Sequence, residues 1–332
     1  MEYRKFGQTG IQISAIGFGC WEIGGGYGSI EEAEFIKAIN RALDVGINSF
    51  DTAEAYGFGA SEKSLAKALG SRRKEAVITT KFGVGYPKAT NYRDSSRKRV
   101  MESIESSLKA LETDYVDVYL IHWPDRSIPF EEPMRALDDL VKQGKARAVG
   151  LSNFKLDEIE TCMKTRRVDV VQYCWNMFDR RMQKEIFPYC RENNIGVMAY
   201  GSLAYGMLTG TFNEEMTFDK GDWRAKRGQL LNINLFQHLF GPDHFLKNLR
   251  AVEELKAMAK RYGKSLPQFA LRWTLSNPIV STALVGCRNP KEVDDNVGAL
   301  GWSISEADMK EIEAIFARHG AVTMPEVWLE TI

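Results

Sequence analysis

The sequence lacks several features that would indicate particular classes of protein. Its 44 basic and 44 acidic residues leave no net charge, whereas a nucleic-acid-binding protein usually carries a basic excess that faces phosphates. The five cysteines are far apart and form no CxxC pair, so neither a zinc site nor a disulfide framework is predicted. The N-terminus is polar, and no apolar run reaches 18 residues. We therefore expect a soluble cytoplasmic protein that uses no metal, nucleic acid or membrane.

The usual nucleotide-binding fingerprints are also missing. No GxGxxG occurs. After Gly17 and Gly19, the position of the third glycine is occupied by Glu22, and after Gly57 and Gly59 it is occupied by Glu62. The fragment GKS at 263–265 imitates the end of a P-loop, but it follows a helical pattern rather than a strand. A dinucleotide, if bound, must be held in another way.

What the sequence does contain is a regular alternation of strands and helices. Short apolar runs rich in β-branched residues are separated by amphipathic stretches of helical period. The predicted strands are 15–20, 47–51, 76–81, 116–122, 146–152, 168–173, 196–200 and 281–286. The predicted helices between them are 31–45, 61–70, 95–112, 131–143, 155–166, 182–194 and 289–299. Eight such units predict an α/β protein with a (β/α)8 (TIM) barrel, formed by one domain over residues 1–332.

Additions to the basic barrel are expected in three places. The N-terminal residues alternate around Gln8–Gly10 and predict a β-hairpin ahead of the barrel. After the seventh strand, we expect a long loop at about 211–245 and two extra helices, 247–262 and 266–276. Loops of that length are usually functional, as a lid or specificity loop. Beyond residue 303 a further helix is predicted.

Reactive side chains stand at the carboxyl ends of several predicted strands, where TIM barrels carry their active sites. Asp51, Lys81, His122 and Tyr200 end strands two, three, four and seven; Asn153 follows strand five, and Gln172 lies near the end of strand six. Each alone has an ordinary alternative: a helix N-cap for Asp51, a solvated lysine, a structural histidine. Their occurrence on one rim favours an active site.

The chemistry that this set suggests is proton donation to a carbonyl oxygen. Tyr56 follows Asp51 closely, and its phenol is a weak acid unless a nearby cation stabilises the phenolate. Lys81 would be that cation, oriented by Asp51, and His122 would hydrogen-bond the substrate oxygen or assist the proton transfer. Because no side chain supplies a hydride, a nicotinamide cofactor is expected.

Phosphates of that cofactor would be held by the loops after strands seven and eight, 200–210 and 285–296. The first loop has small residues that permit close backbone approach, and the second opens a helix beside Arg288. Asn289 and Pro290 would equally form an ordinary N-cap and first turn.

Six segments in this order resemble the signature of the aldo-keto reductase superfamily. They are FDTAEAYGFGASE, TTKFG, LIHWPD, VGLSNF, VQYCWN and LVGCRNPKEVDDN. The resemblance runs from the hairpin to about residue 300. It is strongest toward the longer bacterial-type and potassium-channel-β-like branches.

The resemblance implies a (β/α)8 barrel that reduces aldehydes or ketones with NADPH. Tyr56 would be the general acid, completed by Asp51, Lys81 and His122. The implied cofactor contacts are Ser152, Asn153 and Gln172 at the carboxamide, Tyr200 on the nicotinamide ring, Leu203, Gly206 and Leu208 at the pyrophosphate, and Gly286, Arg288, Glu292 and Asn296 at the adenosine.

This sequence departs from the family pattern at the cofactor end. Gly201 and Ser202 replace Ser-Pro, Thr211 replaces Lys, and Glu292 stands where relatives commonly carry Gln or Arg. These changes remove positive charge or rigidity, while Arg288 favours a 2′-phosphate. NADP is therefore the expected cofactor, with NAD as the alternative.

Aromatic residues after the first and fourth strands are expected to contact a small carbonyl substrate. Trp21 and Trp123 are the predicted substrate residues, with Tyr27 and Tyr86 in adjacent loops. Trp21 would equally plug the barrel mouth. Two alternative functions are a sugar or polyol dehydrogenase of the same family and a cofactor-sensing regulatory subunit of the channel-β kind. No oligomeric state is predicted.

Overall fold

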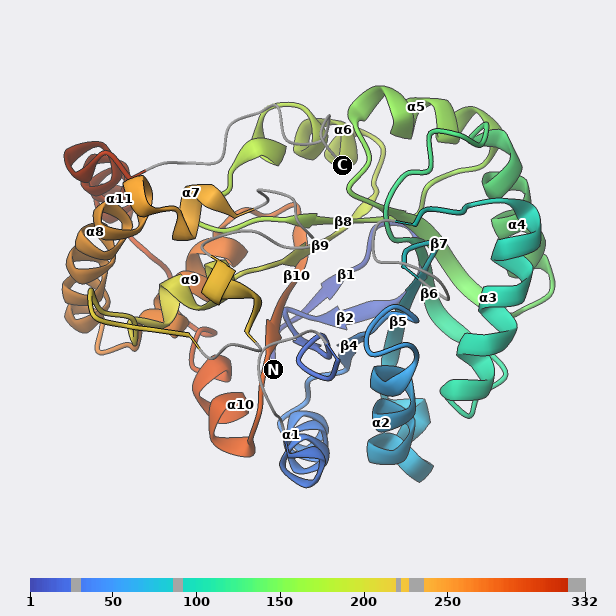
Figure 1. Cartoon of the computed structure of the whole chain (residues 1–332), viewed down its shortest axis with the longest axis horizontal. Helices are drawn as coiled ribbons and strands as arrows, with labels where there is room; N and C mark the ends of the chain where they lie inside the picture. Colours follow the sequence, from blue (N-terminus) through green and yellow to red (C-terminus); the bar gives the residue numbers. More distant parts are fainter. Residues whose placement is uncertain (25–30, 86–91, 219–221, 227–235, 322–332) are drawn as a thin grey trace.

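Eight parallel strands form a closed barrel at the centre of the molecule (Figure 1). The structure is a computed structural model, and it describes residues 1–24, 31–85, 92–218, 222–226 and 236–321. Each strand pairs with the next, and β10 pairs with β3 to close the ring. The barrel strands are β3 (Ile16–Gly19), β4 (Ser49–Asp51), β5 (Val77–Phe82), β6 (Val116–Ile121), β7 (Ala146–Ser152), β8 (Val170–Cys174), β9 (Gly196–Tyr200) and β10 (Val280–Gly286). The predicted (β/α)8 barrel is confirmed.

Helices surround the barrel because each has one apolar face. In α1, Phe35, Ala38, Ile39 and Ala42 are buried at the i, i+3, i+4, i+7 spacing that places side chains on one side of a helix. Figure 1 shows α3 and α4 on one side of the strands and α8 and α11 on the other. The helices that follow single strands are α1 (Glu32–Asp44), α2 (Ala60–Leu69), α3 (Arg97–Ala110), α4 (Glu131–Lys142), α5 (Leu156–Thr165), α6 (Ile186–Glu192) and α10 (Pro290–Val297). Short 3₁₀ turns η1 (Gly70–Glu75) and η2 (Arg181–Gln183) follow α2 and precede α6.

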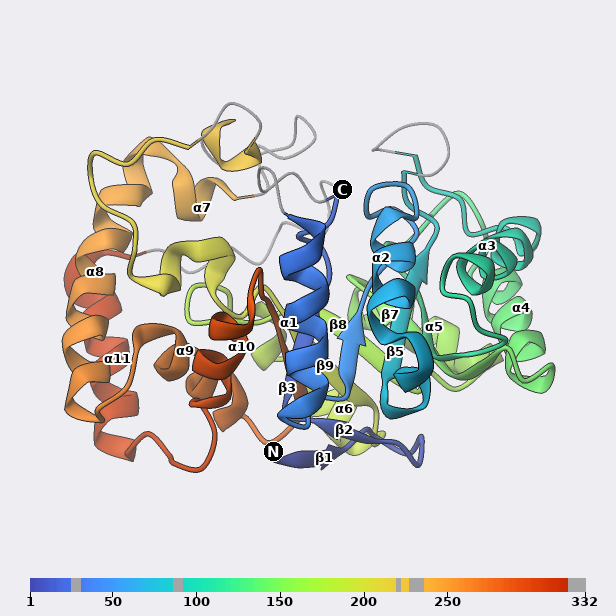
Figure 2. The same cartoon turned by 90° about the horizontal axis from the view of Figure 1, so that it is seen from below.

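The predicted N-terminal hairpin is present and closes one end of the barrel. β1 (Tyr3–Lys5) pairs with β2 (Gln12–Ser14) in antiparallel register. Phe6 and Ile13 are fully buried in a cluster with side chains of the barrel interior, among them Val118 and Met198. Figure 2 shows the hairpin lying across one end of the strands. The opposite end, formed by the carboxyl ends of the strands, is left for a cavity.

The described part of the chain after β9 contains more helical turns than the predicted loop and two helices. It contains η3 (Ala204–Thr209), η4 (Trp223–Lys226), α7 (Gln237–Phe240), α8 (Pro242–Arg261) and α9 (Leu266–Ser276). The expected loop over 211–245 is therefore wrong in part, since it contains two helical turns and the start of α8. Pro242 explains the earlier start, because proline in the first turn of a helix loses no hydrogen bond. The predicted last helix is α11 (Glu306–His319).

None of the helices in the described ranges is long and apolar enough to cross a lipid bilayer.

Candidate active site

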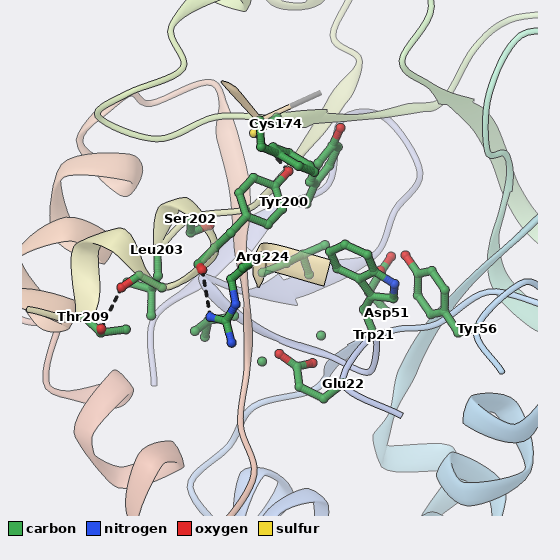
Figure 3. A pocket seen from close by; sticks show the side chains of 18 of the residues that line it. Trp21, Glu22, Asp51, Tyr56, Cys174, Tyr200, Ser202, Leu203, Thr209 and Arg224 are labelled. Atoms are coloured by element: carbon green, nitrogen blue, oxygen red, sulfur yellow. Dashed lines mark hydrogen bonds between the residues drawn. The ribbon is translucent and has the colours of Figure 1, made fainter. Parts of the chain in front are cut away.

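A cavity of about 1030 Å³ opens at the carboxyl ends of the barrel strands (Figure 3). It brings together nearly all of the site residues predicted from the sequence. Those that line it are Trp21, Asp51, Tyr56, His122, Trp123, Ser152, Asn153, Gln172, Tyr200, Leu203, Gly206, Gly286, Arg288, Glu292 and Asn296. Lys81 and Leu208 are fully buried behind the cavity wall. Tyr27 and Tyr86 lie outside the described residues.

Lys81 is the centre of a compact hydrogen-bonded group. Its Nζ donates to Oδ1 of Asp51 at 2.7 Å and to the backbone oxygen of Thr52 at 2.8 Å. The same ammonium lies 3.2 Å from the hydroxyl of Tyr56 and 4.8 Å from the centre of its ring. The second oxygen of Asp51 accepts from Nε2 of Gln172 at 2.6 Å. Strands β4, β5 and β8 therefore place an ion pair directly behind the phenol.

The loop between β4 and α2 turns Tyr56 back over the barrel. The backbone NH of Glu54 donates to the backbone oxygen of Lys81, and its carboxylate accepts from Arg99 at 2.6 Å. Glu54 is almost fully buried, which anchors the loop to β5 and α3. Gly57 has φ of +60°, and a Cβ added to Gly24 would overlap its Cα. Glycine is thus required both by the turn and by the close approach of the two backbones.

His122 stands across the phenol from the ion pair. The rings of Tyr56 and His122 meet edge to face with centres 5.7 Å apart. Within the described part of the chain, Nδ1 of His122 is buried without a hydrogen-bond partner. Burial, with the nearby charges of Lys81 and Arg93, lowers the pKa of His122 well below its usual value. The imidazole is therefore neutral at pH 7 and can donate one hydrogen bond.

Burial governs the ionisation of the central group as well. It raises the pKa of the Tyr56 phenol well above its usual value, and the charges of Asp51 and Glu22 act in the same direction. Burial also raises the pKa of Asp51 and lowers that of Lys81, although their contact favours both charged forms. The expectation that Lys81 lowers the phenol pKa does not hold in the resting site, because the pKa of the phenol is raised and desolvation is the largest cause. Tyr56 is therefore protonated at neutral pH.

The residues expected at the nicotinamide form a second hydrogen-bonded group. Oγ of Ser152 donates to the backbone oxygen of Gln172 at 3.0 Å, and Nδ2 of Asn153 donates to Ser152 and to the backbone oxygen of His122. The hydroxyl of Tyr200 donates to Oδ1 of Asn153 at 2.8 Å, which fixes its ring across the cavity. Asn153 has φ of +66°, a conformation that asparagine tolerates better than most residues.

The two loops expected to bind the phosphates are held in place by contacts within the chain. At Gly206, φ is +102°, and an added Cβ would lie 2.6 Å from Cζ of Phe212. In the loop after β10, Asn289 is the N-cap of α10, so the alternative of an N-cap and first turn is found there. The carboxylate of Glu292 accepts from the backbone NH of Arg288 at 2.8 Å. The side chain of Arg288 is exposed at the cavity edge.

Aromatic residues of the segment after β9 form a wall that the sequence analysis did not identify. Trp21 lies 6.2 Å from Tyr56 and stacks on Trp223 at 6.4 Å, measured between ring centres. Tyr205 contacts Trp223, and Phe236 lies 4.3 Å from Tyr205. The sequence signal was available, since an otherwise polar segment contains several widely spaced aromatics. Trp123, the other predicted substrate residue, lies beneath the guanidinium of Arg93 at 5.7 Å.

Several charged residues of the cavity were also missed, among them Glu22 and Arg224. Glu22 follows Trp21, and Arg224 belongs to η4, which lies far along the chain. Nothing in the sequence links these two positions. Figure 3 shows both side chains in the cavity, pointing toward each other.

A closed parallel barrel with its cavity at the carboxyl ends of the strands defines a (β/α)8 barrel enzyme. The sequence model of the aldo/keto reductase family matches residues 15–317. The chain therefore belongs to the aldo/keto reductase family, and it is an oxidoreductase.

Three similar proteins illustrate this relationship. The aldo-keto reductase YhdN of Bacillus subtilis is 38% identical over 95% of this chain and 93% of its own. The NADH-specific methylglyoxal reductase of Escherichia coli is 32% identical over 93% of this chain and 96% of its own. The solved structure of the glycerol dehydrogenase AKR11B4 from Gluconobacter oxydans superposes with a TM-score of 0.85 at 34% identity, covering 97% of both chains.

Proposed function

We propose that the protein reduces aldehydes or ketones to alcohols by hydride transfer from NADPH, with Tyr56 as the general acid. The observation that carries the proposal is the contact of one buried ammonium, that of Lys81, with both Asp51 and the hydroxyl of Tyr56. This contact supports a proton donor at the cavity with a cation behind it. General acid catalysis of this kind contributes roughly a hundred- to ten-thousand-fold in rate.

Each residue of the group has a defined part in the proton transfer. Tyr56 is protonated at rest and donates its proton as negative charge develops on the carbonyl oxygen. Lys81, at 3.2 Å, stabilises the phenolate that forms, and Asp51 keeps the lysine charged and oriented. The neutral imidazole of His122 donates a hydrogen bond to the same carbonyl oxygen.

The cavity residues fit a nicotinamide dinucleotide, which when bound supplies the hydride. Within the described residues, the hydrogen bonds of the Gln172 side-chain amide leave from its nitrogen, so its oxygen is available to accept from a carboxamide. Tyr200 would present its ring to the nicotinamide. Arg288 at the cavity edge favours the 2′-phosphate of NADP, whereas the adjacent carboxylate of Glu292 favours NAD. The name of the Escherichia coli relative also supports NAD as the alternative.

A second candidate function is oxidation of a polyol by the same site. The likeness to a glycerol dehydrogenase favours it. The same groups would act in reverse, with Tyr56 as phenolate accepting the alcohol proton.

Replacing Tyr56 by phenylalanine tests the proposal. We expect Tyr56→Phe to lower kcat for aldehyde reduction by at least about a hundredfold, because the proton donor is lost. Cofactor affinity should stay within about twofold, since the phenol is not among the expected cofactor contacts. Steady-state turnover of a panel of aldehydes, ketones and polyols with NADPH and NADH is the assay.

Tyr3→Phe is the matched control, because it removes a hydroxyl that is exposed and bonded to Gly46 on the outside of the barrel. Undiminished turnover in Tyr56→Phe would refute the assignment of the acid. Exclusive use of NADH would refute the NADP choice while leaving the acid in place.

A further inference from the structure

The carboxylate of Glu22 occupies a place in the cavity where an anion is expected to bind. Glu22 follows β3, and its Oε1 lies so close to Gly286 at the end of β10 that an added Cβ would overlap it. β3 and β10 are the pair that closes the barrel, with Gly19 opposite Gly286. In barrels of this kind, phosphate is held by the loops after the seventh and eighth strands. Here these are the loops that begin at Gly201 and Cys287.

Among the described residues, no cation neutralises this carboxylate by direct contact. In the described part of the chain, Glu22 makes no ion pair within 4.0 Å. Arg224 points toward it in Figure 3, but its guanidinium is bonded to Asp222 at 2.9 Å. Asp222, and not Glu22, therefore holds the guanidinium of Arg224 in place.

Burial makes the charged form of Glu22 costly. It raises the pKa of Glu22 to about 7, and Glu292 acts in the same direction, while the backbone NH of Glu22 itself, Arg288 and Arg224 oppose the shift. Besides these, the titratable groups coupled to it come from the ends of β3 and β10 and from the loop after β4: Cys20, Cys287 and Tyr56. These three are themselves neutral at pH 7, because burial raises the pKa of each.

We propose that Glu22 competes with the diphosphate of the dinucleotide, so that cofactor binding requires the carboxylate to take up a proton from solvent. Two anions in the space beside Gly286 repel each other, which disfavours the charged form of the carboxylate. The protonated carboxyl removes the repulsion and gains a hydrogen that it can donate to a phosphate oxygen. This inference rests on the proposed function, because it takes the cavity to be the site of a dinucleotide.

The pH dependence of cofactor affinity follows from this competition. Above pH 7 the free protein is increasingly deprotonated at Glu22, and each further pH unit weakens binding by up to about tenfold. Below pH 6 the carboxyl is already protonated, and affinity levels off. From pH 6 to pH 8 we expect the Kd to rise by roughly tenfold.

Titration of tryptophan fluorescence with NADH at pH 6, 7, 8 and 9 tests the inference. NADH is the primary probe because the 2′-phosphate of NADPH itself titrates near about pH 6; NADPH is used at pH 7 and above. Glu22→Gln should give a Kd that is constant with pH within about twofold and tighter than wild type at pH 8 by roughly tenfold. Glu32→Gln is the matched control, because Glu32 lies on the surface beside Lys67 and should leave the wild-type slope unchanged.

Calorimetry of the unmodified protein gives an independent measurement. At pH 8, in buffers of different ionisation enthalpy, wild type should take up close to one proton per NADH bound, and Glu22→Gln none. Binding without proton uptake, or a Kd of Glu22→Gln that rises with pH as in wild type, would overturn the role of Glu22 and leave the proposed function standing. Absence of binding by either cofactor at every pH would instead sink the proposed function.

Discussion

Removal of the Lys81 ammonium should destabilise the protein by an amount that the structure bounds. Lys81 is fully buried and Asp51 nearly so, and they meet at 2.7 Å. In Lys81→Met, the carboxylate of Asp51 is left in the interior without its cation, which typically costs about 3–5 kcal/mol. Protonating the carboxyl limits that cost. From an unfolded pKa near 3.9, protonation at pH 7 costs about three pKa units, or about 4 kcal/mol.

The loss in Lys81→Met must therefore depend on pH with a defined sign. Without Lys81, burial keeps the folded pKa of Asp51 above its unfolded value, as it already does in the intact site. The folded variant then binds a proton that the unfolded chain releases, so its stability falls as pH rises through this window. We expect a loss of about 4 kcal/mol at pH 7 and only about 1.5 kcal/mol at pH 5.

Urea unfolding at pH 5 and pH 7 measures this difference. The double variant Asp51→Asn/Lys81→Met removes both charges and should recover most of the lost stability at pH 7, while turnover stays lost in both variants because the cation behind Tyr56 is missing. A pH-independent loss, or full activity in Lys81→Met, would refute the reasoning about the buried pair.

Two further predictions concern the loop that carries Tyr56. Gly24→Ala and Gly263→Ala both place a side chain at positive φ, but only at Gly24 does the new Cβ overlap the loop, at Gly57. Gly263→Ala should lose about 1 kcal/mol of stability and Gly24→Ala more than that, and only Gly24→Ala should lose most of its turnover. Equal turnover in the two variants would contradict the role of this contact. Arg99→Met leaves Glu54 buried without its partner and should cost about 3 kcal/mol at pH 7 in urea unfolding; a variant as stable as wild type would show that the ion pair does not anchor the loop.

Much of the fold and the rim of the site was predictable from local patterns. Strand and helix positions follow from hydrophobic periodicity, and a parallel βα repeat places the carboxyl ends of all strands at one end of the barrel. Asp51, His122 and Tyr200 were therefore predictable as neighbours without knowledge of any contact. The helical turns within 211–245 were less accessible, because short helices have little periodicity of their own.

The amino-acid sequence by itself thus determined the barrel, the hairpin and the identity of the residues at the strand ends. Only the tertiary structure decided how those residues ionise and what faces them. The pKa of Tyr56 is raised by burial, and burial is a property of the packed site. Likewise, Glu22, Arg224 and Gly286 come from three distant segments, and their proximity arises from closure of the barrel and from the path of the chain after β9. Local sequence encodes periodicity and turns, whereas desolvation and the meeting of charges depend on the whole fold.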